Sequence, residues 1–141
     1  MKLENKYLKV MKSKLAGAGY GLFAKVSFEK GARITEYKGR LCRWRDVKDE
    51  DGHNGYLLRL SRTMAIDALP ATRSMGRYAN DARGLTRVRG LRNNAEYVVD
   101  GLRCFIEASR NIRKGEEILV GYGQEYWQLI RKLRKEKTQL S

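Results

Sequence analysis

The sequence predicts a mostly β domain of short strands that ends in one helix, and three observations lead to this prediction. Short apolar runs are separated by glycines, of which the chain has 14, whereas it has only 1 proline, Pro70. Apolar and polar residues alternate within several of these runs, which is the period of a strand. After residue 124 the period changes to that of a helix. The apolar face of this helix would consist of Tyr126, Leu129, Ile130 and Leu133.

The expected strands lie between turn signals such as glycine, Asn and Asp. They cover residues 8–10, 22–24, 34–37, 56–60, 64–67, 95–99 and 102–108. Asp100-Gly101 is a strong hairpin turn between strands 95–99 and 102–108. Ser61-Arg62 would form the turn between strands 56–60 and 64–67. The charged segment 46–55 and the basic segment 83–93 are expected to be loops, and residues 71–75 a single helical turn.

Length and composition restrict the class of protein. A chain of 141 residues is long enough for one domain with a core. It has no run near the ~20 apolar residues of a membrane span and no apolar signal segment, so an intracellular protein without a membrane partner is expected. Cys42 and Cys104 are expected to be reduced core residues rather than a disulfide. Two cysteines and one histidine do not supply the four ligands of a closed zinc site, so no metal is expected.

The net charge of +14 favours polyanionic partners, and contact with nucleic acid through a basic surface is one interpretation. A well-solvated basic surface without a specific partner is the alternative. Basic residues gather in two places. They are Arg83, Arg87, Arg89 and Arg92 in the middle of the chain, and Arg131, Lys132, Arg134, Lys135 and Lys137 near its end.

Three segments carry the strongest functional signal. Residues 17–24 form a glycine-rich turn before an apolar run, and residues 77–81 have the sequence Arg-Tyr-Ala-Asn-Asp. In residues 115–127, Tyr122 follows an apolar run and precedes Gly123. In this order the three segments resemble the signature of SET-domain protein lysine methyltransferases, and the resemblance extends over residues 7 to 127.

This resemblance implies a SET-domain fold, in which short strands form several small sheets and the C-terminal segment makes a knot-like arrangement with residues 77–81. The first 127 residues would be the SET domain, and residues 128–141 a basic C-terminal helix or tail. The cysteine-rich segments that flank many family members are missing from the sequence. A minimal single-domain member is therefore expected, with the segment from Gln124 in place of the missing part.

In the family the glycine turn holds S-adenosylmethionine through backbone groups, here those of Ala18 and Tyr20. Gly19 allows the close approach that such a contact needs. The second segment of the family motif ends near Asn94. The cofactor-binding residues implied by the resemblance are Ala18, Gly19, Tyr20, Tyr56, Arg77, Asn80, Asp81, Tyr122 and Trp127.

Tyr122 is the implied catalytic residue, because transfer of a methyl group to an amine needs alignment and a dry channel. Its hydroxyl and nearby carbonyls would orient the methyl group by weak CH···O contacts. The implied channel for the substrate lysine consists of Tyr56, Tyr97, Val120 and Tyr126. Tyr97 and Val120 would restrict space around the amine, so monomethylation is expected.

The sequence departs from the family at Asp81, where a histidine is usual, and at Arg83-Gly84, where Ser-Cys is usual. A carboxylate near the sulfonium would attract a cationic cofactor, but it does not replace a histidine as a hydrogen-bond donor. Two readings remain on this basis. The chain is either an active methyltransferase, or a catalytically inactive SET-like module that binds nucleic acid or a protein partner.

The leading hypothesis is an S-adenosylmethionine-dependent protein-lysine N-methyltransferase whose protein substrate is a histone or another lysine-containing protein. Because the chain is strongly positive, it would repel a free basic tail, which is therefore disfavoured as a substrate. A nucleosome, a ribonucleoprotein or an acidic-flanked peptide is therefore the expected target, in a nucleus or host nucleus. A small basic ribonucleoprotein subunit with accidental motif matches is a third alternative.

Overall fold

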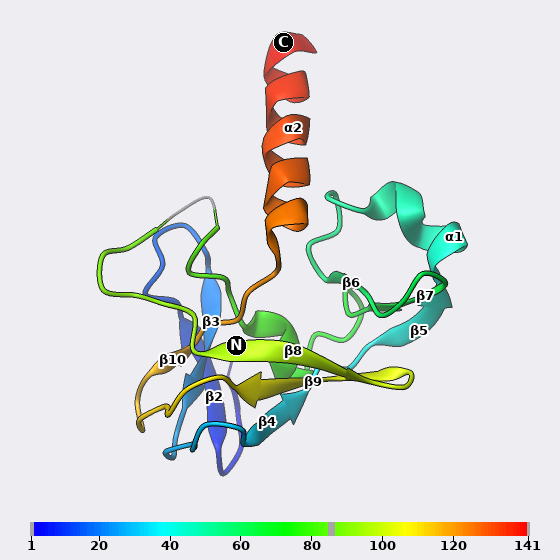
Figure 1. Cartoon of the computed structure of the whole chain (residues 1–141). Helices are drawn as coiled ribbons and strands as arrows, with labels where there is room; N and C mark the ends of the chain where they lie inside the picture. The colour runs from blue at the N-terminus through cyan, green and yellow to red at the C-terminus, as the bar shows by residue number, and fades with distance from the viewer. Residues whose placement is uncertain (1, 85–86, 141) are drawn as a thin grey trace.

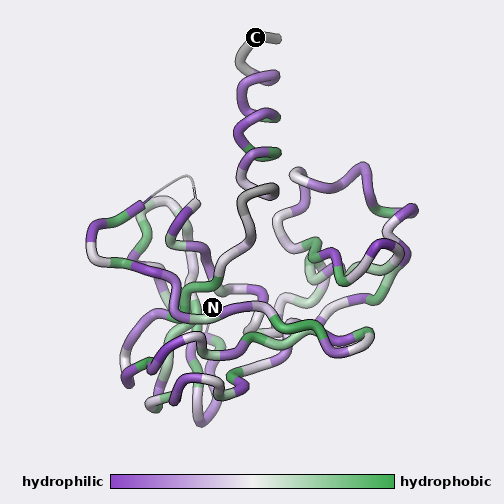
Figure 2. Tube along the Cα trace, viewed as in Figure 1, coloured by the Kyte–Doolittle hydropathy of each residue, from purple (hydrophilic) through white to green (hydrophobic). Residues whose placement is uncertain are grey.

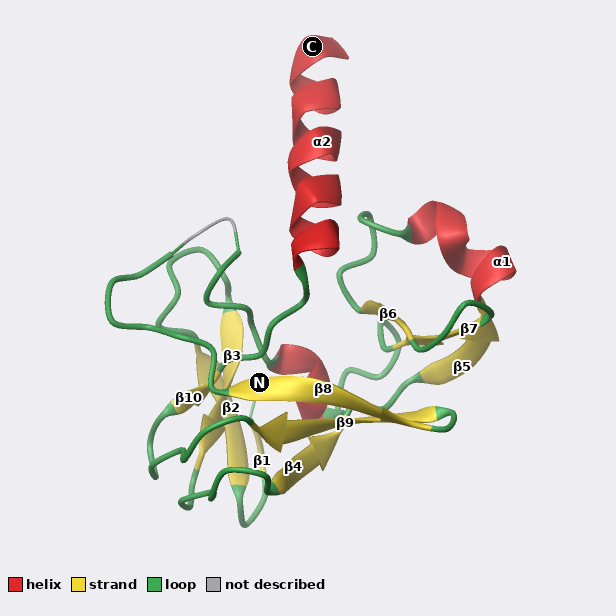
Figure 3. Cartoon of the chain, viewed as in Figure 1, coloured by secondary structure: helices red, strands yellow, loops and turns green. Residues whose placement is uncertain are grey.

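The structure is a computed structural model that describes residues 2–84 and 87–140, apart from the side chains of residues 124–125 and 138–140. It confirms a mostly β architecture with small antiparallel sheets and a C-terminal helix (Figure 3). The strands are β1 (Leu3–Glu4), β2 (Leu8–Lys12), β3 (Tyr20–Ala24), β4 (Arg33–Glu36), β5 (Arg40–Arg43), β6 (Leu57–Arg59), β7 (Met64–Asp67), β8 (Ala95–Asp100), β9 (Arg103–Ala108) and β10 (Glu117–Ile118).

The first sheet has the order β1-β2-β3-β10 and joins the beginning of the chain to its later part. Leu8 and Val10 of β2 point into the core while Lys9 and Met11 are exposed, as the strand period predicts. Glu117 of β10 pairs with Phe23 of β3. The last strand of this sheet, β10, therefore lies more than 90 residues after its neighbour β3 in the sequence.

The second sheet has the order β4-β9-β8, and its centre, β9, is buried along most of its length. The predicted hairpin of β8 and β9 is confirmed, with Asp100 opposite Arg103 and Gly101 at a φ of 62°. Glycine suits this turn because its positive φ is strained for other residues. In Figure 1 this hairpin crosses the middle of the molecule and reaches toward the third sheet.

The third sheet has the order β5-β7-β6 and confirms the hairpin expected for residues 56–67. The expected loop of residues 46–55 is partly wrong, because α1 (Trp44–Val47) and the 3₁₀ helix η1 (Lys48–Glu50) occupy its start. Val47 is buried and anchors these short helices among charged neighbours. One apolar residue in a charged segment has no helical period, so the pattern did not indicate them.

The helical turn expected over residues 71–75 is misplaced. The structure has tight turns there, and the 3₁₀ helix η2 (Met75–Tyr78) begins where the expected turn ends. Met75 and Tyr78 are both buried, and a spacing of three places them on one face of a 3₁₀ helix. Burial of these two side chains therefore fixes the position of η2.

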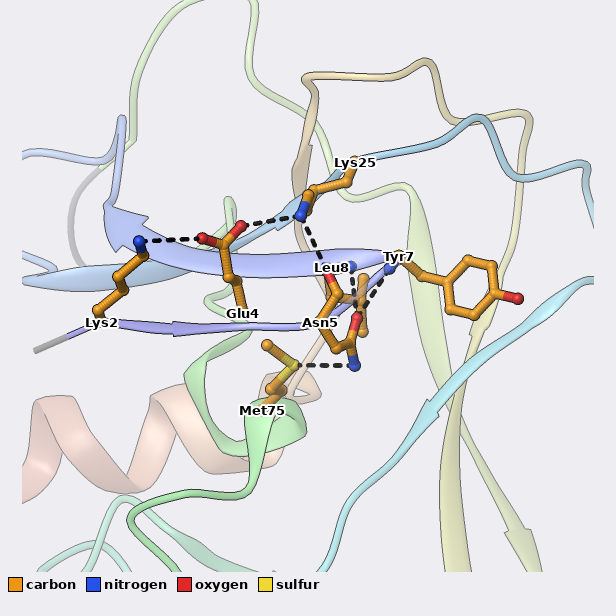
Figure 4. Close-up of polar contacts among 7 residues, drawn as sticks. All are labelled: Lys2, Glu4, Asn5, Tyr7, Leu8, Lys25 and Met75. Atoms are coloured by element: carbon orange, nitrogen blue, oxygen red, sulfur yellow. Dashed lines mark hydrogen bonds and ion pairs between the residues drawn. The ribbon is translucent and has the colours of Figure 1, made fainter.

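A network of polar contacts holds the N-terminal hairpin against η2 (Figure 4). Lys25 donates to the carboxylate of Glu4 at 2.8 Å and to the carbonyl of Asn5 at 2.9 Å. The amide of Asn5 reaches Sδ of Met75 at 3.4 Å. Because Arg77 is part of η2, these contacts help to position a predicted site residue.

The C-terminal helix α2 (Gln124–Leu140) confirms the predicted change of period and stands out from the sheets in Figure 1. Figure 2 shows it as mostly hydrophilic, with apolar residues recurring along it. Leu129 and Leu133 lie close to Gly52, where an added Cβ would be 2.6 Å from Leu133 Cδ1 and 3.0 Å from Leu129 Cδ2. The helix is therefore held near its start by the loop after η1.

Both cysteines are free: Cys104 is fully buried and Cys42 is half-buried. Among the described residues, no helix is both long and apolar enough to cross a membrane. In the same part of the chain, no three His, Cys, Asp or Glu side chains gather as a metal site would need.

Candidate functional site

Two pockets lie on the two sides of Tyr122. The glycine-turn pocket has a volume of about 420 Å³ and is lined by Ala18, Gly19, Tyr20, Gly55, Tyr56, Arg77, Tyr78, Asn80, Tyr122 and Tyr126. The tyrosine pocket has a volume of about 340 Å³ and is lined by Tyr37, Trp44, Asp51, Gly55, Leu57, Leu58, Arg59, Tyr97, Val99, Tyr122, Tyr126 and Leu129. Gly55, Tyr122 and Tyr126 belong to both pockets, so the pockets meet at these residues.

The glycine turn owes its shape to Gly17 and Gly19, whose φ values are 78° and 72°. The carbonyl of Gly19 accepts a hydrogen bond from Ser13 N–H at 2.8 Å, which closes the turn. The side chain of Asn80 donates to the carbonyl of Tyr20 at 2.9 Å and joins the turn to the chain after η2. The structure therefore brings the first two predicted segments together as two walls of one pocket.

Arg77 forms another part of this wall. Its Nη1 donates to the carbonyls of Ala68 and Leu69 at 2.8 and 2.7 Å, and its guanidinium stacks on the ring of Tyr56 at 3.7 Å. Its Nε is buried and is the one such side-chain atom that lacks a hydrogen-bond partner in the described part of the chain. A buried unpaired donor is costly, so this N–H suits an acceptor brought in by a ligand.

Tyr122 lies in the middle of a group of aromatic rings. It stacks on Trp127 at 5.7 Å and on Tyr97 at 6.2 Å, and it meets Tyr126 edge-on at 5.4 Å. Its hydroxyl donates to the carbonyl of Ala79 at 2.5 Å. Burial raises the pKa of Tyr122 far above its usual value, so its hydroxyl stays protonated and neutral.

Tyr37 and Tyr97 form the far wall of the tyrosine pocket, where their rings meet edge-on at 5.7 Å. The hydroxyl of Tyr37 donates to the carbonyl of Tyr56 at 2.7 Å. Burial raises the pKa of both tyrosines, so their hydroxyls stay protonated and this wall is uncharged. Tyr37 was missed as a site residue; the apolar strand before it was the only signal, and it did not show which pocket the ring would face.

The side chain of Asp81 lies behind Tyr122 rather than among the residues that line the glycine-turn pocket. Its Oδ2 accepts hydrogen bonds from Tyr122 N–H at 2.9 Å and from Trp127 Nε1 at 2.7 Å. Its Oδ1 accepts from Arg83 N–H and Asn93 Nδ2, both at 2.8 Å. Burial acts to raise the pKa of Asp81, but these four hydrogen bonds outweigh it and hold the pKa below its usual value.

Asn94 holds the segment that leads to Tyr122. Its Nδ2 donates to the carbonyl of Glu117, its Oδ1 accepts from Leu119 N–H, and its own N–H donates to the Leu119 carbonyl, all at 2.9 Å. The same segment also forms parallel bridges, from Leu119 to Asn80 and from Val120 to Ala95. The third predicted segment is thus held against the second, which sets the position of Tyr122.

Three of the predicted site residues line neither pocket: Asp81, described above, Val120 and Trp127. Val120 is fully buried in the main core cluster, where its backbone N–H donates to the Asn80 carbonyl at 2.8 Å. Trp127 packs on the back of Tyr122 and bonds to Asp81, so it supports the site from behind. The other predicted channel residues, Tyr56, Tyr97 and Tyr126, all line one pocket or both.

A glycine turn, a C-terminal segment bridged to residues 80 and 95, and a partly buried tyrosine between two pockets define a class of proteins, and comparison with known proteins identifies it. The SET-domain family matches residues 19–123. The chain therefore belongs to the SET-domain family, as the three sequence segments predicted.

Two relatives illustrate the similarity. The chain is 30% identical over 119 residues to N-lysine methyltransferase KMT5A-A of Danio rerio, which covers 77% of this chain and 33% of the relative. It is 31% identical over 139 residues to histone-lysine N-methyltransferase EZH2 of Chaetomium thermophilum, which covers 91% of this chain and 9% of the relative. The chain therefore spans about a third of the first relative and much less of the second.

The fold is also similar to a solved structure, a humanized mutant of the Chaetomium thermophilum Polycomb Repressive Complex 2 bound to the inhibitor GSK126. The TM-score is 0.67 at 27% identity, over 91% of this chain and 16% of that chain.

Proposed function

We propose that this chain is an S-adenosylmethionine-dependent protein-lysine N-methyltransferase. The observation that carries the proposal is that the glycine-turn pocket and the tyrosine pocket share Gly55, Tyr122 and Tyr126. A cofactor on one side and a lysine on the other would meet at the hydroxyl of Tyr122. The family and the printed names of the relatives above support the same activity.

The residues of the glycine-turn pocket fit the cofactor. The unpaired Nε–H of Arg77 suits the carboxylate of its amino-acid part, and the turn around Gly19 leaves the backbone open to a close approach. Tyr20 is half exposed at the rim of the pocket, and Tyr56 stacks on Arg77. Both rings therefore provide aromatic surface for the rest of the cofactor molecule. When bound, S-adenosylmethionine supplies a methyl group on a positively charged sulfur.

The tyrosine pocket fits the side chain of a lysine. The rings of Tyr37, Tyr97 and Tyr126 offer apolar surface to the methylene groups of that side chain, in a pocket that Asp51 and Arg59 also line. Removal from water disfavours the charged ammonium, so the pocket promotes the neutral amine that must attack the methyl group. The aromatic rings of this pocket would hold the neutral amine nitrogen in line with the methyl group that the cofactor would supply, and water would take up the proton that the amine releases.

Tyr122 would orient the two reactants rather than act as a base. Its raised pKa keeps the hydroxyl neutral, and its proton is committed to the carbonyl of Ala79. The lone pairs of the hydroxyl oxygen remain available for weak CH···O contacts with the methyl group. Fixed dipoles of this kind act strongly in a dry site because they need no rearrangement during the reaction.

A histone or another lysine-containing chromatin protein is the proposed substrate, with the reaction in a nucleus or host nucleus. Two relatives carry histone in their names, the EZH2 protein described above and set-17 of Caenorhabditis elegans, which is 30% identical over 119 residues, or 84% of this chain and 41% of that protein. The charge of +14 favours a histone presented with nucleic acid over a free basic tail.

The experiment compares the protein with its Tyr122→Phe and Tyr7→Phe variants. Tyr7 is exposed and lies outside both pockets, so it is a matched control. Cofactor binding is measured by calorimetry, and methyl transfer with labelled cofactor on histones and nucleosomes. We expect Tyr122→Phe to bind the cofactor but to lose at least about a hundredfold in transfer, with Tyr7→Phe unchanged. Absence of cofactor binding, or full activity of Tyr122→Phe, would contradict the proposal.

A further inference from the structure

The two basic clusters of the sequence meet at a third pocket, which we name the arginine pocket. It has a volume of about 350 Å³ and lies between the loop of residues 83–93 and the start of α2. Arg83 and Arg87 come from the loop, and Arg131 comes from the helix, more than 40 residues later. Nη2 of Arg87 donates to the Arg83 carbonyl at 3.2 Å, which holds the two loop residues together.

The charge of the arginine pocket is not neutralised by its own residues. In the described part of the chain, none of the three arginines forms an ion pair, and all three are exposed. The one acidic residue of the lining, Asp81, is buried and directs its oxygens at four internal donors. The described lining thus carries three positive charges against one enclosed negative charge, which favours an external anion.

The kind of anion follows from the surroundings. Arginine presents a planar fork of donors that matches the oxygens of a phosphate group. Apart from part of Trp127, the rest of the lining is polar or glycine, including Asn93, Gln128 and Gly121, whereas a groove for a protein segment would offer apolar anchors. A phosphate is therefore a better match than an acidic peptide.

The basic surface continues from the arginine pocket along α2. Arg131 and Lys135 are four residues apart and lie on the same side of the helix, about 6 Å apart along its axis. Lys132 and Lys135 are exposed like Arg131, and α2 stands out from the body of the protein in Figure 1. A row of charges on a projecting helix suits a polymer of phosphates rather than a single ion.

We propose that the arginine pocket and the adjoining basic side of α2 bind the sugar-phosphate backbone of a nucleic acid. The pocket shares Asp81 and Trp127 with the support of Tyr122, so a bound backbone would lie directly behind the residue that faces the lysine. The biological role of this binding rests on the proposed function, because a bound nucleic acid would place the enzyme at a lysine presented beside DNA or RNA. Binding itself does not depend on methyl transfer.

The test measures binding of a short fluorescent DNA duplex of random sequence by polarisation, over a series of salt concentrations. A triple variant with Arg83→Gln, Arg87→Gln and Arg131→Gln is compared with a control triple variant with Arg62→Gln, Arg73→Gln and Arg113→Gln. Both variants lose three exposed arginines, so they have the same net charge. Thermal unfolding and cofactor calorimetry, without any duplex, report separately on the fold and on the proposed function.

We expect the arginine-pocket variant to lose at least about tenfold in affinity, and its slope of log affinity against log salt to fall by about 2 to 3. The control variant should change both quantities much less. Equal losses in the two variants would show binding by overall charge and would overturn the proposal. So would the absence of duplex binding by the native protein, or equally tight binding of a polyglutamate peptide, which would indicate an acidic protein partner.

Discussion

The indole of Trp127 and the backbone N–H of Tyr122 donate to the same carboxylate oxygen of Asp81, at 2.7 and 2.9 Å. One oxygen therefore fixes both the first turn of α2 and the residue that faces the two pockets. The other oxygen holds the chain on the opposite side, through Arg83 and Asn93. In this chain the position where family members usually have a histidine is thus a structural junction.

Asp81→Asn is expected to destabilise the protein. An amide offers one accepting oxygen, and its NH₂ group would face two of the present donors, which then remain buried without partners. At about 1 to 3 kcal/mol for each of the two unpaired donors, the free energy of unfolding should fall by about 2 to 6 kcal/mol. Denaturant unfolding measures it, with Asp49→Asn in the exposed helix η1 as the control. A loss as small as that of the control would contradict the role of Asp81.

The stabilisation by Asp81 should disappear in acid. Its pKa is lowered from 3.8 in the folded protein, so the contribution is fully present above about pH 3.8 and is lost as the pH falls through the folded value. Other carboxylates titrate equally in the native protein and in Asp81→Asn. The difference in stability between these two proteins should therefore shrink below about pH 3.8. If the difference in unfolding free energy between the two proteins stayed constant down to the lowest pH at which they fold, this prediction would be contradicted.

Gly84→Ala is expected to disturb the support of Tyr122 through a steric clash. An added Cβ would lie 2.4 Å from Cζ2 and 2.6 Å from Cη2 of Trp127, and the φ of Gly84 presents no obstacle of its own. Trp127 must shift, at a cost of about 1 to 3 kcal/mol. In a Trp44→Phe background, indole fluorescence reports the shift directly. Gly121→Ala is the control, because its Cβ would meet only Asn93 Nδ2 at 3.6 Å; equal effects in both variants would refute the clash.

Tyr97→Phe is expected to change the product of the proposed reaction. The ring of Tyr97 lies between Tyr37 and Tyr122 in the tyrosine pocket, so its hydroxyl takes up space beside a bound amine. Without that hydroxyl a second methyl group has room, and the fraction of dimethyl- and trimethyl-lysine should rise. Mass analysis of the modified peptide measures it, with Tyr7→Phe as the control. Mainly trimethyl-lysine from the native protein would show that monomethylation is wrong.

Local patterns predicted most of the elements because strands, turns and α2 have their own periods and turn residues. The hairpin at Gly101 and the helix after Gln124 are examples. Patterns did not predict what depends on distant partners. Asp81 was expected at the cofactor, but its donors include Trp127, 46 residues away. Val120 was expected in the channel, yet a segment held by two isolated parallel bridges has no regular strand period that shows which way its side chains point.

The hydrogen bonds that join Glu117 to Ser13 and Lys14 connect the two ends of the domain, and they bear on when the site can form. Glu117 accepts hydrogen bonds from Ser13 Oγ at 2.6 Å and from Lys14 N–H at 2.8 Å, across more than 100 residues. A ribosome delivers the N-terminal hairpin first, and domains complete their folding only when their last segment has emerged. A nascent chain that stops before Glu117 lacks β10, so β3 has an unpaired edge, and it also lacks Tyr122, where the two pockets meet. The proposed site can therefore form only after the segment that carries Tyr122 has been synthesised.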